Sequence, residues 1–280
     1  MKLLRYGPPG QEKPGLLDDA GTIRDLSAEI PDLAGEALSA AGLARLASLD
    51  VSALPAVSGS TRLGPPVAGM KNFVCIGLNY ADHAAETGAA IPKEPIIFLK
   101  SLGALQGPDD DVVIPKDSVK TDWEVELAVI IGEKAKNVSE AEAMDFVAGY
   151  TICNDVSERE WQTERGGTWD KGKGADTFGP LGPWLVTKDA VPDAQNLAMF
   201  CEIDGHRYQD GSTRTMIFGV AKLVSYVSHF ITLHPGDVIT TGTPPGVGMG
   251  QKPPVFLKAG QRIRLGIEGL GEQNQKTVAG

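Results

Sequence analysis

Short apolar runs, separated by glycine, proline and polar residues, dominate the chain from about residue 72 onward. Runs of this length with turn residues between them are typical of β-strands. The pattern predicts strands at 73–76, 95–99, 112–114, 123–131, 149–153, 184–186, 198–203, 238–241 and 262–267. Helical spacing is found near 80–86, 139–146 and 219–230, and Asp204-Gly205 marks a hairpin turn. We therefore predict a β-rich α+β fold.

The first part of the chain has a different pattern. Residues 2–6 and 16–23 have the character of a strand and a hairpin, and residues 35–49 carry alanine and leucine at helical spacing. Prolines and a Ser-Gly-Ser stretch follow between residues 55 and 66. We therefore predict a small N-terminal α+β domain over residues 1–67 and a larger β-rich domain over residues 68–280.

Composition excludes several classes of function. The chain carries 26 basic and 36 acidic residues, a net charge of −10, and lacks the basic clusters that nucleic-acid binding requires. No run approaches the roughly 20 apolar residues of a membrane-spanning helix, and the first residues do not resemble a secretory signal. The three cysteines are scattered and form no CxxC pair. We expect a cytoplasmic protein with neither a nucleic-acid nor a membrane partner.

Alternating acidic residues begin the most informative strand. Asp122, Glu124 and Glu126 would share one face of the strand predicted at 123–131. Two carboxylates about 7 Å apart repel by roughly 2 kcal/mol at an effective dielectric near 20, unless a cation lies between them. A solvated edge strand is the alternative interpretation, although the apolar residues that follow favour a buried strand. The pattern alone leaves both interpretations open.

Two further features suggest a reaction centre. Asp155 ends an apolar strand, where it would either cap a helix or provide a third carboxylate for a hard cation such as Mg²⁺ or Mn²⁺. His83 and Glu86 are three residues apart on a predicted helix, so a carboxylate would lie beside an imidazole. Such a pair can act as a general base, but it is also common on solvent-exposed helices without any function.

Five motifs between about residues 70 and 250 bring these residues together. They are Asn79-Tyr80-x-x-His83-x-x-Glu86, Glu124-x-Glu126, Asn154-Asp155-Val156-Ser157-x-Arg159-x-x-Gln162, Lys173-Gly174-x-Asp176-Thr177-Phe178-Gly179-Pro180, and Thr240-Thr241-Gly242-Thr243-Pro244-Pro245-Gly246-Val247. Their content and order resemble the fumarylacetoacetate hydrolase family. The resemblance implies a mixed β-sandwich roll with a small N-terminal α+β domain, and a homodimer.

The resemblance also implies a set of site residues. A divalent cation, Mg²⁺ or Mn²⁺, would be held by Glu124, Glu126 and Asp155. His83, oriented by Glu86, would activate a water molecule. The remaining predicted residues contact the substrate, with Lys173 in a catalytic role: Lys173, Arg159, Gln162, Thr243 and Tyr80. The segment 80–95 is expected to form a mobile lid over the site.

The family's substrates are mostly 2,4-diketo acids and related 2-oxo acids. The motifs resemble those of bacterial members that hydrolyse 2,4-diketo-3-deoxy sugar acids of the rhamnonate and fuconate kind, whose sequences often carry ureidoglycolate lyase labels. Hydrolysis would release pyruvate and a hydroxy acid such as lactate. The alternatives are fumarylpyruvate hydrolase, oxaloacetate decarboxylase and ureidoglycolate lyase. From another class, a non-catalytic sugar-acid-binding protein remains open, although a binding protein has no need of the His83–Glu86 pair.

Overall fold

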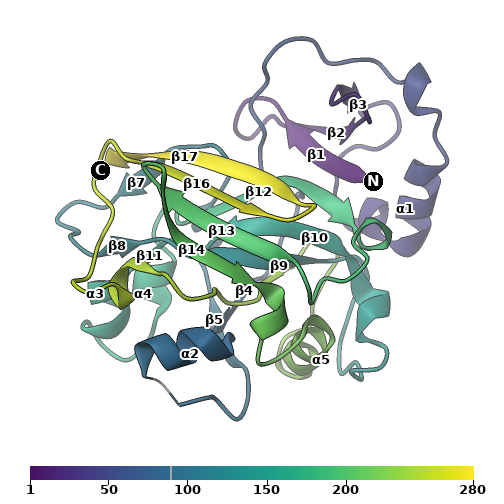
Figure 1. The fold of residues 1–280 in the computed structure, drawn as a ribbon. Coiled ribbons are helices and arrows are strands. Elements are labelled where there is room, and N and C mark those ends of the chain that lie inside the picture. Colours follow the sequence, from purple (N-terminus) through teal and green to yellow (C-terminus); the bar gives the residue numbers. More distant parts are fainter. Residues whose placement is uncertain (89) are drawn as a thin grey trace.

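The computed structural model describes residues 1–88 and 90–280 and is built on one large and one smaller β-sheet (Figure 1). The large sheet has ten strands in the order β3-β2-β1-β12-β10-β9-β15-β4-β5, with β6 paired to β12. Its strands are β1 (Lys2–Tyr6), β2 (Lys13–Leu17), β3 (Ile23–Asp25), β4 (Phe73–Gly77), β5 (Ile96–Leu99), β6 (Leu105–Gln106), β9 (Val125–Ile131), β10 (Val147–Asn154), β12 (Gly179–Thr187) and β15 (Val238–Thr240).

The smaller sheet has five strands in the order β14-β13-β16-β17-β7. These are β7 (Val112–Ile114), β13 (Ala198–Ile203), β14 (His206–Ser212), β16 (Arg262–Ile267) and β17 (Gly271–Ala279), and a separate two-stranded pair joins β8 (Thr121–Asp122) to β11 (Ser157–Glu158). The α-helices are α1 (Ala40–Ala47), α2 (Ala81–Thr87), α3 (Arg159–Thr163), α4 (Asp170–Lys173) and α5 (Val220–Phe230). Short 3₁₀ helices lie at Gly35–Leu38, Val51–Ala53, Leu102–Ala104, Ala143–Phe146, Lys188–Ala190, Thr213–Thr215 and Gly248–Gly250.

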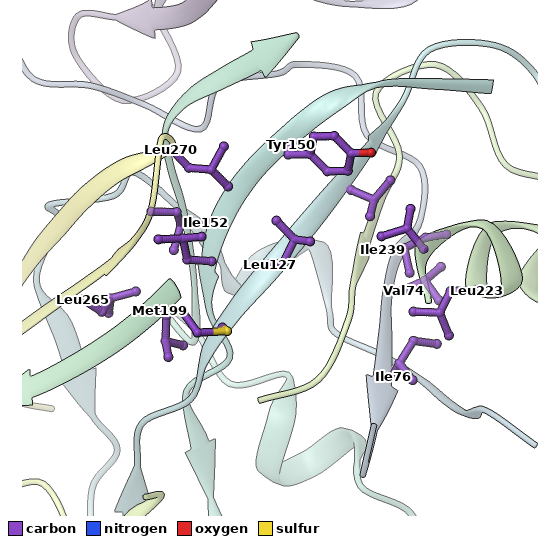
Figure 2. Close-up of a cluster of buried hydrophobic side chains, with 14 of the residues drawn as sticks. Val74, Ile76, Leu127, Tyr150, Ile152, Met199, Leu223, Ile239, Leu265 and Leu270 are labelled. Atoms are coloured by element: carbon purple, nitrogen blue, oxygen red, sulfur yellow. The ribbon is translucent and has the colours of Figure 1, made fainter. Parts of the chain in front are cut away.

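The two sheets enclose the main hydrophobic core. Figure 2 shows Leu127 and Ile152 of the large sheet close to Met199 and Leu265 of the smaller one, all of them buried. Strand β9 is buried on both faces, because Leu127 and its alternate neighbours face this core while Ala128 and Ile130 belong to a second apolar cluster. That second cluster, on the other face of the sheet, includes residues of the N-terminal segment. The β-rich α+β class predicted from the sequence is confirmed.

The N-terminal segment continues the large sheet. Strand β1 pairs antiparallel with β12, and Lys2 and Leu3 face Val186 and Leu185. In Figure 1, β1–β3 and α1 lie on the opposite side of the molecule from α2, α3 and α4. The division at residue 67 stays a prediction. Among the described residues, no helix has both the length and the apolar character needed to span a membrane.

Two of the predicted helices are wrong in extent. Residues 139–146 contain only the 3₁₀ turn Ala143–Phe146, preceded by a turn in which Glu142 N donates to Ser139 O. The predicted helix 35–49 is divided at Ser39, whose side chain accepts a hydrogen bond from Gly42 N (3.0 Å). A serine in this role begins a new helix instead of continuing the preceding one.

Candidate active site

Three acidic side chains meet in the interior, at the start of β9 and just after the end of β10. Glu126 belongs to β9, Glu124 immediately precedes it, and Asp155 follows Asn154, the last residue of β10. Backbone pairing aligns them, because Cys153 faces Glu126 and Asp155 N donates to Glu124 O (2.9 Å). One carboxylate oxygen from each residue lies within 4.8 Å of the others, and all three side chains are buried. We call these three residues the carboxylate triad.

Three buried cations surround the triad. Lys173 Nζ lies 2.6 Å from Glu124 Oε2 and 2.8 Å from Asp155 Oδ2. Arg159 Nη2 lies 2.7 Å from Glu124 Oε1, and the Lys100 ammonium pairs with the other oxygen of Asp155. Burial by itself would raise the pKa of Glu124, but Lys173 and Arg159 outweigh it and hold that pKa well below its ordinary value.

Glu126 has a different environment. No lysine or arginine of the described chain forms an ion pair with it, and its Oε2 accepts a hydrogen bond from Gly242 N (2.8 Å). Burial, followed by the negative charges of Asp155 and Glu124, raises the pKa of Glu126 well above its ordinary value. A buried carboxylate without a cationic partner is costly, and a bound cation would remove that cost.

The donor set fits a hard divalent cation. Carboxylate oxygens are the ligands that Mg²⁺ and Mn²⁺ prefer, and oxygens this close together can be reached by one ion. With Asp122, which pairs with Arg159 (2.8 Å), four carboxylates face the cations Lys100, Arg159 and Lys173. One negative charge is then in excess when all are ionised. A divalent ion would convert this into an excess of one positive charge, which suits an anionic ligand in a protein of net charge −10.

The predicted base lies on α2. His83 Nδ1 and Glu86 Oε2 are 3.0 Å apart. Glu86 is itself held in place, since the backbone N–H of Gly246 lies 3.1 and 3.3 Å from its two carboxylate oxygens. A carboxylate at Nδ1 keeps a proton on that nitrogen and leaves Nε2 as the basic one.

A cavity of about 240 Å³ connects the triad with His83. Of the other predicted residues, Arg159, Gln162, Lys173 and Thr243 also line it. Gln162 Oε1 accepts from Arg159 Nη1 (3.0 Å), and Thr243 Oγ1 donates to Val125 O (2.9 Å). The structure therefore brings these predicted residues together around one cavity, with Glu86 behind His83.

Tyr80 is not among the described residues that line this cavity. Its ring is fully buried in the main core, and its hydroxyl donates to Met199 Sδ (3.4 Å). Its backbone carbonyl accepts the first hydrogen bond of α2, from Ala84 N. The structure therefore places the Tyr80 side chain in the core and outside the lining of this cavity, and its contact with substrate stays a prediction. Ala89, within the predicted lid 80–95, lies outside the described residues.

One charged residue of the site, Lys100, was not predicted, and another, Asp122, differs from its predicted position. Lys100 directly follows β5, is completely buried, and also donates to Val156 O (3.1 Å). A lysine at the end of an apolar strand was the only signal of it in the sequence. Asp122 does not face the triad as the strand pattern predicted, because it accepts hydrogen bonds from Gly248 N (2.6 Å) and Met249 N (3.0 Å). It orients Arg159 instead of binding a cation.

Comparisons with known proteins agree with this architecture. Residues 72–278 match the family model described as fumarylacetoacetate hydrolase C-terminal. A Burkholderia cenocepacia protein is 69% identical over 278 residues, which cover 99% of each chain. Its name describes it only as a hydrolase. Among solved structures, a fumarylacetoacetate hydrolase from Exiguobacterium antarcticum has a TM-score of 0.87 and 34% identity, with 100% of both chains covered.

A second similar structure holds ligands. It is the maleylpyruvate hydrolase of Sphingobium sp. SYK-6 in complex with manganese(II) and pyruvate, with a TM-score of 0.82, 29% identity, and 100% of both chains covered. Other similar structures, from mycobacteria, are named as isomerases. The fold of this protein is that of the fumarylacetoacetate hydrolases, as the resemblance implied. By its sequence match and its structure, the chain belongs to the fumarylacetoacetate hydrolase family.

Proposed function

We propose that the protein is a divalent-metal-dependent hydrolase that cleaves the carbon–carbon bond of a 2,4-diketo acid and releases pyruvate and a carboxylic acid. The observation that carries this proposal is one cavity lined both by the buried carboxylate triad and by His83, which is hydrogen-bonded to Glu86. The ligands named for the similar maleylpyruvate hydrolase, manganese and pyruvate, support the same chemistry.

The triad would hold Mg²⁺ or Mn²⁺. When bound, the cation supplies Lewis-acid polarisation of the 2-oxo group of the substrate. The protein's own part is to give two of the three buried carboxylates cationic partners: Lys173 and Arg159 pair with Glu124, and Lys173 and Lys100 pair with Asp155. The third, Glu126, would gain its positive partner from the bound cation itself. Lys173 also lines the cavity, so its ammonium can stabilise negative charge on the substrate.

His83 acts as the general base. Its Nε2 takes a proton from water while the water oxygen adds to the carbonyl carbon C4 of the diketo acid. The bond between C3 and C4 then breaks, its electron pair passes to the pyruvyl fragment as an enolate, and a proton added at C3 gives pyruvate. Glu86 holds the imidazole in the required tautomer and stabilises its protonated form. Gln162 and Thr243 line the same cavity and would add hydrogen bonds to the substrate.

The sequence resemblance pointed to a diketo-sugar acid as the substrate. The proteins named above act on, or bind, other compounds, and none of them is named for a sugar acid. The proposal therefore covers 2,4-diketo acids as a class, and the nature of the acyl group is argued from the cavity in the next subsection.

The test is product release from a panel of substrates, with metal-free enzyme and with enzyme supplied with Mg²⁺ or Mn²⁺. Pyruvate is measured for the 2-oxo acids, and glyoxylate is measured for ureidoglycolate. The panel contains several acylpyruvates, oxaloacetate and ureidoglycolate. We expect metal-dependent pyruvate release from acylpyruvates, at rates well above those with oxaloacetate. Cleavage of ureidoglycolate without acylpyruvate cleavage, or decarboxylation of oxaloacetate alone, would contradict the proposal.

A further inference from the structure

The lining of the cavity combines two chemically different sets of residues. One is the triad with its cations. The other consists of large apolar residues from four separate segments of the chain: Ile76, Leu78, Ile96, Phe98, Trp169 and Met249. Ile76 packs in the main core, and the other five carry the argument that follows.

Two aromatic rings belong to this apolar set, and one of them borders the triad directly, because Lys173 Nζ lies 5.2 Å from the centre of the Phe98 ring. Ile96 and Phe98 alternate on β5 and so face the same way. The ring of Trp169 lies edge-on against Phe98, with centroids 5.4 Å apart and an interplanar angle of 63°. Gly77 leaves room for the indole, because a Cβ there would lie 2.4 Å from Trp169 Cζ3. The indole is therefore built into the cavity wall and is not a freely rotating surface side chain.

Leu78 contributes to the same apolar lining from an unusual backbone conformation. Its φ is +48°, in the left-handed region that glycine and asparagine adopt readily and a branched apolar residue adopts rarely. Such strain is concentrated at ligand-binding positions, where the surrounding structure compensates for it. Met249, which is 38% exposed, completes an apolar surface that an unliganded protein leaves partly open to water.

Polar groups are scarce beside these side chains. Among the described residues that line the cavity, the uncharged polar side chains are Gln162, Thr163 and Thr243, and His83 is the proposed base. The lysine and the arginine in the lining, Lys173 and Arg159, already form ion pairs at the triad. A second carboxylate placed against the apolar side chains would therefore have to compete with the triad for these cations. A chain of hydroxyl groups would lose more hydrogen bonds to water than these side chains could replace.

We infer that Leu78, Ile96, Phe98, Trp169 and Met249 form an apolar subsite for the acyl group of the substrate. This inference rests on the proposed function, which places the 2-oxo acid end at the triad. The substrates are then 2,4-diketo acids with an alkyl or aryl acyl group. Hydroxylated sugar acyl groups and acyl groups with a second carboxylate are disfavoured.

Binding tests the subsite without turnover. Dissociation constants of 2-oxo acids for the Mn²⁺-loaded protein are measured by calorimetry, with pyruvate, 2-oxobutanoate, 2-oxohexanoate, phenylpyruvate, 2-oxoglutarate and a 3-deoxy-2-oxo sugar acid. We expect affinity to rise by about fourfold for each added methylene, the usual gain for burying one. Phenylpyruvate should bind at least tenfold more tightly than pyruvate. The inference is overturned if phenylpyruvate binds no better than pyruvate, or if the dicarboxylate or the sugar acid binds best.

Two substitutions locate the effect. Leu78→Asn removes the apolar side chain but tolerates the positive φ, so the melting temperature should not fall. Met249→Gln changes a partly exposed residue and should also fold normally. Each should weaken phenylpyruvate binding by roughly five- to tenfold while changing pyruvate binding less than twofold. Phe230→Ala, which removes an exposed ring on α5 outside the cavity, is the control and should change neither constant. Equal losses for both ligands in the two cavity variants would refute the subsite.

Turnover separates this inference from the proposed function. If no diketo acid releases pyruvate but the binding preference for apolar 2-oxo acids is found, the proposed hydrolysis fails and the subsite stands. If hydroxylated or dicarboxylic diketo acids are cleaved at least as efficiently as alkyl and aryl ones, judged by kcat/KM, the subsite fails and the hydrolysis stands.

Discussion

Glu126→Gln should weaken metal binding and make the metal-free protein less sensitive to pH. Glu126 is 1% exposed and is the triad member for which the described structure shows no ion pair. Burial and two neighbouring carboxylates raise its pKa. Because the folded protein then holds this proton to a higher pH than the unfolded chain, stability falls as pH rises from the unfolded pKa, about 4.3, towards the raised pKa. One such group lowers the free energy of unfolding by up to about 1.4 kcal/mol for each pH unit within that window.

Glutamine keeps the shape of this side chain but replaces its carboxyl group with an amide that does not titrate. Metal-free Glu126→Gln should therefore be at least as stable as the metal-free wild type at pH 7, and its stability should fall less between pH 5 and pH 7. The assay is urea unfolding of EDTA-treated proteins at pH 5, 6 and 7. Glu140→Gln, at an exposed position, is the matched control and should follow the wild type.

Metal addition completes the test. At a Mn²⁺ concentration of 100 times the dissociation constant, the wild type should gain about 2.7 kcal/mol of stability. Glu126→Gln should gain much less at the same concentration, because one of three carboxylate ligands has lost its charge. Equal stabilisation of both proteins by Mn²⁺, or a metal-free variant clearly less stable than the metal-free wild type, would refute the reasoning.

Three further predictions concern the base, the α2 segment and the assembly. His83→Ala should lower kcat by roughly 10² to 10⁴ in a pyruvate-release assay while Mn²⁺ and oxalate affinities, measured by calorimetry, stay within about twofold; loss of Mn²⁺ binding instead would show that the imidazole has been misassigned. Glu86→Gln should cause a smaller loss of kcat, and the double variant should be little worse than His83→Ala, since the two residues act as one unit. Hydrogen exchange in residues 80–95 should slow when Mn²⁺ and oxalate are added, as expected for a lid, and unchanged exchange would reject the lid. Light scattering should give twice the 29.5 kDa chain mass for the homodimer that the family resemblance implies, and a monomer mass would contradict it.

Most strands were predictable because their apolar residues alternate with polar ones or form short runs between clear turn residues. Strand β17 is the counterexample, since its inward-facing residues are Gln273, Gln275 and Thr277, all buried. Gln273 Nε2 donates to the carbonyl oxygens of Ile152 (2.9 Å) and Gly182 (3.0 Å). Buried polar residues that hydrogen-bond to the backbone carbonyl groups of other strands give no hydropathy signal. This strand is therefore visible only in the structure.

The triad was predictable from the sequence in a way that the apolar subsite was not. Glu126 lies on β9 with Glu124 just before it, and Asp155 directly follows the neighbouring strand β10, so local spacing brings them close. Leu78, Phe98 and Trp169 come from segments far apart in the chain and meet only through the order of strands and the placement of α4. The burial of Tyr80 was not predictable for the same reason, because a motif position does not tell which face of a loop turns towards the core.

The source of the oxygen in the products tests the central claim most directly. The wild-type enzyme, loaded with Mn²⁺, is supplied with an alkyl acylpyruvate in water enriched in ¹⁸O, and both products are examined by mass spectrometry. Hydrolysis predicts one ¹⁸O atom from solvent in the carboxylic acid released from the acyl side, and none in pyruvate beyond the exchange seen when pyruvate alone is incubated. Turnover of the acylpyruvate without ¹⁸O in an acyl-side acid, as in isomerisation or decarboxylation, would contradict the account.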